Sequence, residues 1–437
     1  MAFVNNNHSL AMVPYVRQSD VAEQSQVCAH EPIKARVQRV MDSFCAHMKS
    51  LEENRYLSTY KALQLGGKET MESRMIRSAI AICPTHSEEE TALRLFNYNK
   101  ATQYLSHLTD ENLSELLTTA TPLGSGIGGE VLSMEVEGVP LFVKKIRLTP
   151  IEQQHLGSTL NLFELPSYYQ YGVGSMGFGV WREISAHEMT TQWVLNGECQ
   201  NFPLMYHYRA LQRSTPPTMP TSEQLEERQR YVDDWNGSST VGIRAQAADL
   251  ASADVVVFME NFPQTLYKWL KAEGDKGNLT EQSIANLERE LNMVTAFMKS
   301  RGFLHFDAHF HNILASNDHV YFADFGLAMS HKFDCSLEEM TFFEKHSSYD
   351  RYYVVSELVK NAIAATVHEG SEVLLNAYLS TEKMTTTLPS AVASIAERYR
   401  PIAVLMDKFF QGLRKESKST PYPEAELSRE WAKLQDM

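Results

Sequence analysis

The sequence has no long apolar run and no excess of basic residues. No stretch approaches the roughly twenty consecutive apolar residues that a membrane-spanning helix needs. The first residues, MAFVNNNHSLAMVPYVRQSD, lack the basic start and the apolar segment of a secretory signal. A formal net charge of −14 and an isoelectric point near 5.6 argue against a surface that mainly binds nucleic acid. We therefore expect a soluble protein with no membrane span and no nucleic-acid partner.

Cysteine is also scarce. The chain has five cysteines, which are Cys28, Cys45, Cys83, Cys199 and Cys335. Their number is odd and no two of them form a CxxC pair, which is typical of reduced thiols rather than of a disulfide framework or a zinc site. We expect a cytoplasmic protein.

What the sequence does have is enough apolar residues for a full core, distributed unevenly along the chain. It has 437 residues, of which 43% are apolar. Apolar residues recur at three- and four-residue spacing in IKARVQRVMDSFCAHM (33–48) and EEETALRLFNYNKATQYLSHL (88–108), which predicts helices.

We expect a mostly helical extension over residues 1–119, either a packed extension or a docking module. A sheet-rich part follows over 120–262, with a polar surface insertion at 212–249, and a helix-rich part over 263–437. This α+β pattern predicts a cleft between two lobes.

A glycine-rich segment opens the sheet-rich part. TPLGSGIGGEVLSMEVEGVPLFVKKIRL (121–148) predicts two strands, a turn at VEGVP and a third strand. Gly124, Gly126, Gly129 and Val131 fit the pattern GxGxxGxV, in which glycines let backbone N–H groups approach phosphate oxygens. The motif is weak alone, because a glycine-rich hairpin turn explains it equally well. No helix follows directly, which argues against a dinucleotide-binding Rossmann unit.

Lys144 ends the strand LFVK, where its ammonium group would lie near nucleotide phosphates if the strand returns beside the glycine loop. Such a lysine needs an acidic partner, and the next predicted helix offers Glu183 and Glu188. We favour Glu188, because it lies in the middle of the helix, one turn before the anchoring residue Trp193. Glu183 remains a competitor at the helix start, where we expect fraying.

The strongest chemical signal is HFDAHFHN (305–312), followed by DFG at 324–326. Asp307 is placed to accept a proton from a substrate hydroxyl. Asn312 and Asp324 supply the hard oxygen ligands that Mg²⁺ prefers. The segment between them predicts a tight hairpin that returns Asp324 to Asn312. The three histidines of this stretch have the wrong spacing for zinc, and we expect His305 to be a buried residue that orients the loop.

Taken together, these motifs resemble the protein kinase superfamily in their order along residues 120–360. The resemblance implies a two-lobed kinase fold that binds ATP and Mg²⁺. It makes Asp307 the catalytic base and Asn312 and Asp324 the metal ligands, and it lets Lys144 and its glutamate position the phosphates. DVVVFMENF (254–262) is similar to a kinase hinge, with Met259 near the gatekeeper position and Glu260 to Phe262 facing the adenine. LPSYYQYGVGSMGFGVWRE (165–183) is similar to a stretch of bacterial kinase-like proteins.

The departures from the family pattern leave the acceptor open. Phe306 stands where many protein kinases have arginine, and His309 where Ser/Thr kinases have lysine. No Ala-Pro-Glu motif follows Asp324, and Asp350, the expected brace of the catalytic loop, comes early. We expect a divergent Ser/Thr protein kinase first and an aminoglycoside-kinase-like enzyme acting on a small-molecule hydroxyl second. Nucleotidyl transfer and a pseudokinase scaffold remain alternatives.

Overall fold

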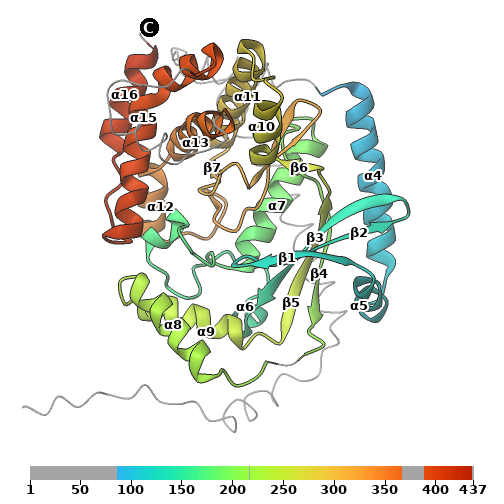
Figure 1. The fold of residues 1–437 in the computed structure, drawn as a ribbon. Coiled ribbons are helices and arrows are strands. Elements are labelled where there is room, and N and C mark those ends of the chain that lie inside the picture. Colours follow the sequence, from blue (N-terminus) through green and yellow to red (C-terminus); the bar gives the residue numbers. More distant parts are fainter. Residues whose placement is uncertain (1–85, 216, 367–387, 436–437) are drawn as a thin grey trace, which may run out of the picture. The chain divides into compact units, whose positions relative to one another are not determined.

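The computed structural model of the chain describes residues 86–215, 217–366 and 388–435 (Figure 1). The chain divides into two units, Met1–Thr70 and Met71–Met437, and every described residue belongs to the second. This unit is α+β, as predicted. The helix predicted at 33–48 and most of the predicted N-terminal extension lie outside the described residues.

A five-stranded antiparallel sheet, with the strand order β1-β2-β3-β5-β4, forms the first half of this unit. Its strands are β1 (Thr121–Gly126), β2 (Gly129–Val136), β3 (Val139–Leu148), β4 (Met205–Gln212) and β5 (Ala253–Glu260). The turn predicted at VEGVP joins β2 to β3 through Glu137 and Gly138, whose φ angles are 52° and 77°. Two successive positive φ angles are typical of the two-residue hairpin turn whose twist matches that of the strands.

Each face of the sheet packs against a helix. Helix α4 (Glu88–His107) packs against β4 and β3 on one face, and the short helix α5 (Asp110–Thr118) follows it (Figure 1). Helix α7 (Val180–Leu195) packs on the other face. Alternation along β3 supports both contacts, since Leu141 and Val143 belong to the core shared with α4, and Ile146 and Leu148 to the core shared with α7.

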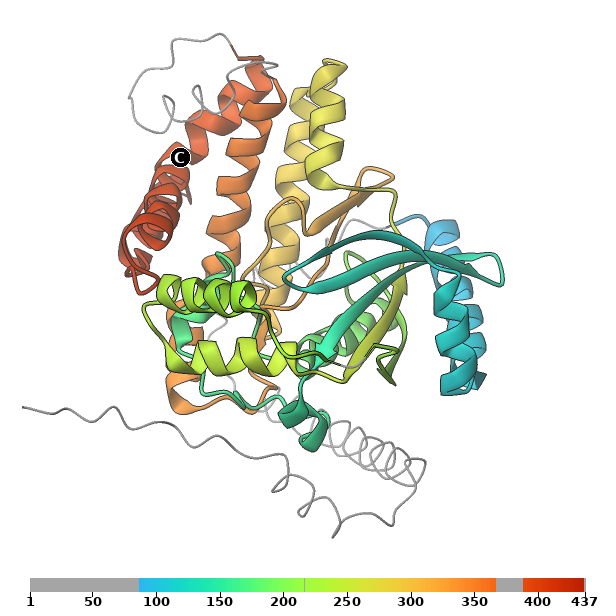
Figure 2. The ribbon, with the colours of Figure 1, turned by 60° about the horizontal axis from the view of Figure 1, so that its bottom comes forward.

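The connections before α7 and between β4 and β5 hold further short elements. They are α6 (Pro150–Gln154), a 3-10 helix (Ser167–Tyr171), α8 (Ser222–Asp234) and α9 (Ser239–Asp249). The insertion predicted at 212–249 is therefore mostly helical, and α8 and α9 lie side by side (Figure 2). Helix α8 buries no residue, as a surface insertion should, but α9 buries Val241, Arg244, Ala245 and Ala248.

The remaining residues are mainly helical, with short strands around the predicted catalytic loop. The helices are α10 (Leu266–Asp275), α11 (Glu281–Ser300), α12 (Leu337–Lys345), α13 (Tyr349–Ala365), α15 (Ser390–Lys415) and α16 (Glu424–Gln435). The strands are β6 (Gln264–Thr265), β7 (Phe303–Leu304), β8 (Ile313–Ser316), β9 (His319–Phe322) and β10 (Met329–Ser330). None of the helices in the described ranges is long and apolar enough to cross a membrane.

Candidate active site

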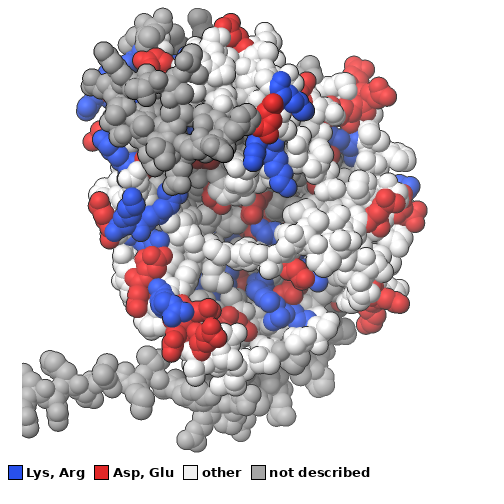
Figure 3. All heavy atoms as spheres, viewed as in Figure 1, with Lys and Arg blue, Asp and Glu red and all other residues white. Residues whose placement is uncertain are grey.

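The central residues of the predicted site line one cavity of about 390 Å³. The sheet contributes Gly129 and Lys144, helix α7 contributes Glu183, and the helix-rich half contributes Asp307 and Asp324. Charged side chains of both signs surround the hollow on this face of the molecule (Figure 3). Segments that are far apart in the sequence therefore meet at one place.

Lys144 is the centre of a buried charge cluster. Its Nζ donates to Glu183 Oε1 at 2.7 Å and to Asp324 Oδ1 at 2.8 Å. Burial lowers the pKa of Lys144, but Asp324 and Glu183 raise it by more, so the net shift is upward and the lysine stays a cation. A cation fixed between two carboxylates is suited to meet phosphate oxygens.

The prediction that Glu188 pairs with Lys144 is wrong, because Glu183 is the partner. Glu188 interacts instead with the hydroxyl of Tyr208 on β4, and burial raises the pKa of its carboxyl group. Five residues along a helix correspond to about 140° of rotation, so the two glutamates face different neighbours. The first turn of α7 is not frayed, since Val180 N donates to Glu152 Oε1 at 2.8 Å.

The predicted catalytic loop holds Asp307 in a defined position. Asn312 Nδ2 donates to Asp307 Oδ2 at 2.9 Å and to the Asp307 carbonyl at 3.1 Å. Burial, followed by the negative charge of Asp324, raises the pKa of Asp307 to about 7. Its side chain keeps 29% of its surface accessible, so a substrate hydroxyl can reach it. This position and this pKa suit a general base.

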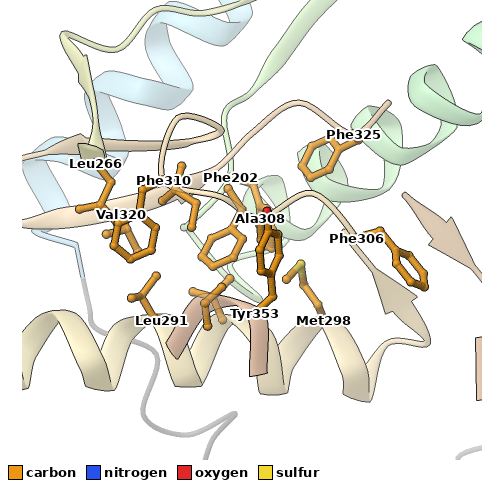
Figure 4. Packing of buried hydrophobic residues seen from close by; sticks show 14 of the residues in the cluster. Phe202, Leu266, Leu291, Met298, Phe306, Ala308, Phe310, Val320, Phe325 and Tyr353 are labelled. Atoms are coloured by element: carbon orange, nitrogen blue, oxygen red, sulfur yellow. The ribbon is translucent and has the colours of Figure 1, made fainter. Parts of the chain in front are cut away.

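Beneath the loop, Asp350 acts as the predicted brace. Its carboxylate accepts from His305 N at 2.7 Å and from Phe306 N at 2.9 Å. Phe306, Ala308 and Phe325 anchor the surrounding backbone in the core (Figure 4). His305 is fully buried and its Nε2 contacts the carbonyl oxygen of Ala323 at 2.9 Å, which confirms the expected structural role.

The predicted hairpin returns Asp324 to Asn312. Strands β8 and β9 pair through a turn at Asn317 and Asp318, whose φ angles are 50° and 62°. At its open end, Ala323 N donates to the carbonyl oxygen of Asn312 at 2.9 Å. The spacing between the two predicted metal ligands is thus the length of this hairpin.

The donor set fits a magnesium ion that is shared with phosphates. Asp324 Oδ1 contacts Lys144, whereas Oδ2 accepts no hydrogen bond from the described residues, and the side chain is 44% exposed. Asn312 donates its amide nitrogen to Asp307, and its amide oxygen accepts no hydrogen bond from the described residues, but Asn312 itself does not line the cavity. The described residues contain no cluster of three or more His, Cys, Asp or Glu that could hold a metal by itself. Such a site suits Mg²⁺, which commonly takes one or two carboxylates together with substrate phosphates.

Several residues predicted to contact the nucleotide do not line the cavity. They are Gly124, Gly126, Val131, Met259, Glu260 and Phe262. The Glu260 carboxylate forms two 2.8 Å hydrogen bonds with Arg94 of α4, and the Phe262 ring packs on Tyr321 at 4.2 Å between centroids. Met259 is buried among the apolar residues between the sheet and α7. The hinge-like segment thus binds α4 through the contact between Glu260 and Arg94, which the sequence did not indicate.

The loop of residues 172–179, GVGSMGFG, lies within the stretch that resembles bacterial kinase-like proteins, and it lines the cavity beside Asp307, a role that the sequence did not indicate. A Cβ atom on Gly172 would lie 3.4 Å from Asp307 Oδ1, and one on Gly177 would lie 2.4 Å from the carbonyl oxygen of Gly326. Lys418 Nζ donates to the carbonyl of Val173 at 3.3 Å and so ties the loop to the segment after α15. The dense glycines were the available signal, because they permit such close packing.

No protein-family model matches the chain, and no curated protein matches its sequence.

Proposed function

We propose that the protein is a magnesium- and ATP-dependent phosphotransferase that transfers the γ-phosphoryl group of ATP to a hydroxyl group. One observation carries this proposal, the convergence of Lys144, Glu183 and Asp324 with Asp307 on one cavity. Phosphoryl transfer needs positioned charges and an oriented hydroxyl rather than a covalent intermediate. The five-stranded sheet with α7, set against a helix-rich half, supports a protein-kinase-like two-lobed fold as part of the proposal.

Each group has a part in the proposed reaction. Lys144, held by Glu183, binds phosphate oxygens. Mg²⁺ held by Asn312 and Asp324 would neutralise the phosphate charge. Asp307 orients the acceptor and takes its proton, while the acceptor oxygen bonds to the γ-phosphorus and the bond to the β–γ bridging oxygen breaks, which releases ADP.

The residues that surround Asp307 support a small-molecule acceptor over a protein Ser or Thr. The loop 172–179 lies against Asp307, and the wall of the cavity also includes Arg244 of α9 and Phe410 and Arg414 of α15. We expect these elements to restrict the approach of a peptide to Asp307 more than that of a small molecule. Of the two acceptor classes expected from the sequence, a small hydroxyl compound therefore has the better structural support.

The test is to incubate the full chain with Mg-ATP and a panel of small hydroxyl compounds and of peptides that contain Ser and Thr. Intact masses would be measured together with the nucleotide products. We expect ADP, together with an acceptor that gains one phosphate, and no such product from the Asp307→Asn variant. Formation of AMP-modified products would indicate nucleotidyl transfer instead. If the chain shows neither Mg-dependent ATP binding nor ATP turnover, the proposal is overturned in favour of a pseudokinase.

A further inference from the structure

Arg244, on α9, is a buried cation with no anionic partner in the described part of the chain. The residue is only 4% exposed, and its Nε and Nη1 atoms are buried without a hydrogen-bond partner. No described Asp or Glu forms an ion pair with it. The guanidinium instead stacks over the ring of Phe163, with Cζ 5.1 Å from the ring centroid.

A buried charge without a partner needs an explanation, because desolvating it is costly unless an opposite charge compensates. Other buried arginines of this protein have such partners, since Arg94 pairs with Glu260 and Arg182 with Glu339. Arg244 differs from them in that it lines the cavity of the proposed active site. Its missing partner is therefore expected to be a ligand that enters this cavity.

Two more guanidinium groups line the same cavity. Arg147 is half-exposed and lies 3.4 Å from Asp254, which also pairs with Arg213, so its charge is only partly neutralised. Arg414 of α15 is exposed and stacks on Phe410. The cationic groups that line the cavity apart from Lys144 thus suit a ligand with more than one negative charge.

The position of Arg244 connects it with the acceptor rather than with ATP. Phe163, on which it stacks, belongs to an apolar cluster with Leu165, Tyr169, Phe178, Trp235 and Val241. Tyr169 and Phe178 stand at or near the two ends of the loop 172–179, and this loop lies so close to Asp307 that a Cβ atom added at Gly172 would be 3.4 Å from Asp307 Oδ1. One packed unit therefore carries both Arg244 and the loop that borders the proposed base.

On the basis of the proposed phosphotransferase function, we propose that the acceptor is a small hydroxyl compound that already carries a phosphate monoester, and that Arg244 binds this phosphate. A phosphate monoester has close to two negative charges at neutral pH and three acceptor oxygens. The planar guanidinium matches these oxygens with paired hydrogen bonds. Binding there places the free hydroxyl of the acceptor in the cavity that Asp307 lines.

The experiment measures binding of inorganic phosphate to the full chain by isothermal titration and by the phosphate-induced rise in Tm. It is done without nucleotide and again with a saturating, non-hydrolysable Mg-ATP analogue. The variants are Arg244→Gln and, as a matched control, Arg230→Gln. Arg230 is on the same insertion but 65% exposed, and it lies outside the cavity.

We expect phosphate to bind the wild type and Arg230→Gln equally, with or without the analogue, and Arg244→Gln about tenfold or more weakly. Unchanged phosphate binding by Arg244→Gln would overturn the proposal. So would a loss of phosphate binding in the wild type when the analogue is present, because Arg244 would then serve the nucleotide. Binding of the Mg-ATP analogue is measured separately. If the chain binds no nucleotide but still binds phosphate through Arg244, the proposed phosphotransferase function is refuted, and Arg244 remains an anion-binding site.

Discussion

Asp307 and Asp324 are the same chemical group, yet their surroundings separate them. Burial raises the pKa of both, but Lys144 acts more strongly on Asp324 and lowers its pKa to about 2. Asp307 lacks such a close cation and feels the charge of Asp324, so its pKa rises to about 7. Two carboxyl groups whose pKa values are driven apart in one site are typical of divided roles. In the proposed function, Asp324 would stay an anion for Lys144 and the metal, and Asp307 would be the base that takes a proton.

The pKa of Asp307 predicts how activity depends on pH. Below about 7 its carboxyl group is protonated and cannot accept the proton of the acceptor, and above that pH it is ionised. We therefore expect kcat/KM to rise with pH through an apparent pKa near 7. Asp307→Asn should lower turnover by on the order of a thousandfold, about 4 kcal/mol of barrier, and remove this rise. The measurement is kcat/KM across the neutral range, and a profile that is level there in the wild type would contradict the role of Asp307.

The two glutamates of α7 provide a matched test of the lysine pair. Glu183→Gln removes a carboxylate 2.7 Å from Lys144, whereas Glu188→Gln changes a group that contacts Tyr208. A hydrogen bond between charged groups contributes about 1.5–3 kcal/mol, so we expect Glu183→Gln to lower turnover about 10- to 100-fold. Glu188→Gln should remain close to the wild type. Equal losses in the two variants, with folding checked by circular dichroism, would show that the contact seen at Lys144 does not matter for turnover.

At the scale of elements, short-range patterns were predictable and long-range anchoring was not. β-forming residues after the turn at VEGVP located β3, and the hairpin at 317–318 followed from turn residues between two short strands. The correct glutamate did not follow, because the start of α7 is fixed by residues distant in sequence. Arg182 pairs with Glu339 at 2.7 Å, and Glu152 accepts from Val180 N. Arg244 had no sequence signal either, since its burial depends on how α9 packs.

The glycine-rich hairpin of β1 and β2 offers a prediction at this scale, because different atoms surround its glycines. A Cβ on Gly129 would lie 2.1 Å from the carbonyl oxygen of Lys145, and its φ of 123° is unfavourable for other residues. A Cβ on Gly126 would have no atom within 4 Å. We expect Gly129→Ala to lower the free energy of unfolding by about 2 kcal/mol, and Gly126→Ala to change it by less than about 0.5 kcal/mol.

Denaturant titration of both glycine variants measures this difference directly. Similar free energies of unfolding for the two would mean that the loop adjusts its backbone and that β2 does not approach β3 as closely at this point as the structure has it. A stability loss confined to Gly129→Ala would locate the constraint at the residue pair that closes the hairpin, where Gly129 of β2 faces Gly126 of β1.

At the scale of the whole described unit, the site is built from both halves. Lys144 comes from the sheet and Asp324 from the segment after β9, and their 2.8 Å contact bridges 180 residues of sequence. A ligand that binds these groups therefore contacts the sheet and the helix-rich half together. Because it binds only the folded state, it stabilises the protein against unfolding of the unit as a whole.

This predicts metal-dependent stabilisation by ATP. Without a divalent ion, the triphosphate would bring its charge next to the Asp324 carboxylate, whereas Mg²⁺ held by Asp324 and Asn312, as proposed, would be attracted to both groups and offset this repulsion. We expect ATP to raise Tm only when Mg²⁺ or Mn²⁺ is present, by an amount equivalent to about 2.7 kcal/mol at about 100 times Kd. Asp324→Ala should remove the metal-dependent part, while Asp318→Ala, a change at the tip of the same hairpin, should keep it. Equal stabilisation of the wild type with and without metal would remove Asp324 from its proposed role. Metal dependence that persists in Asp324→Ala would move the ion to other ligands.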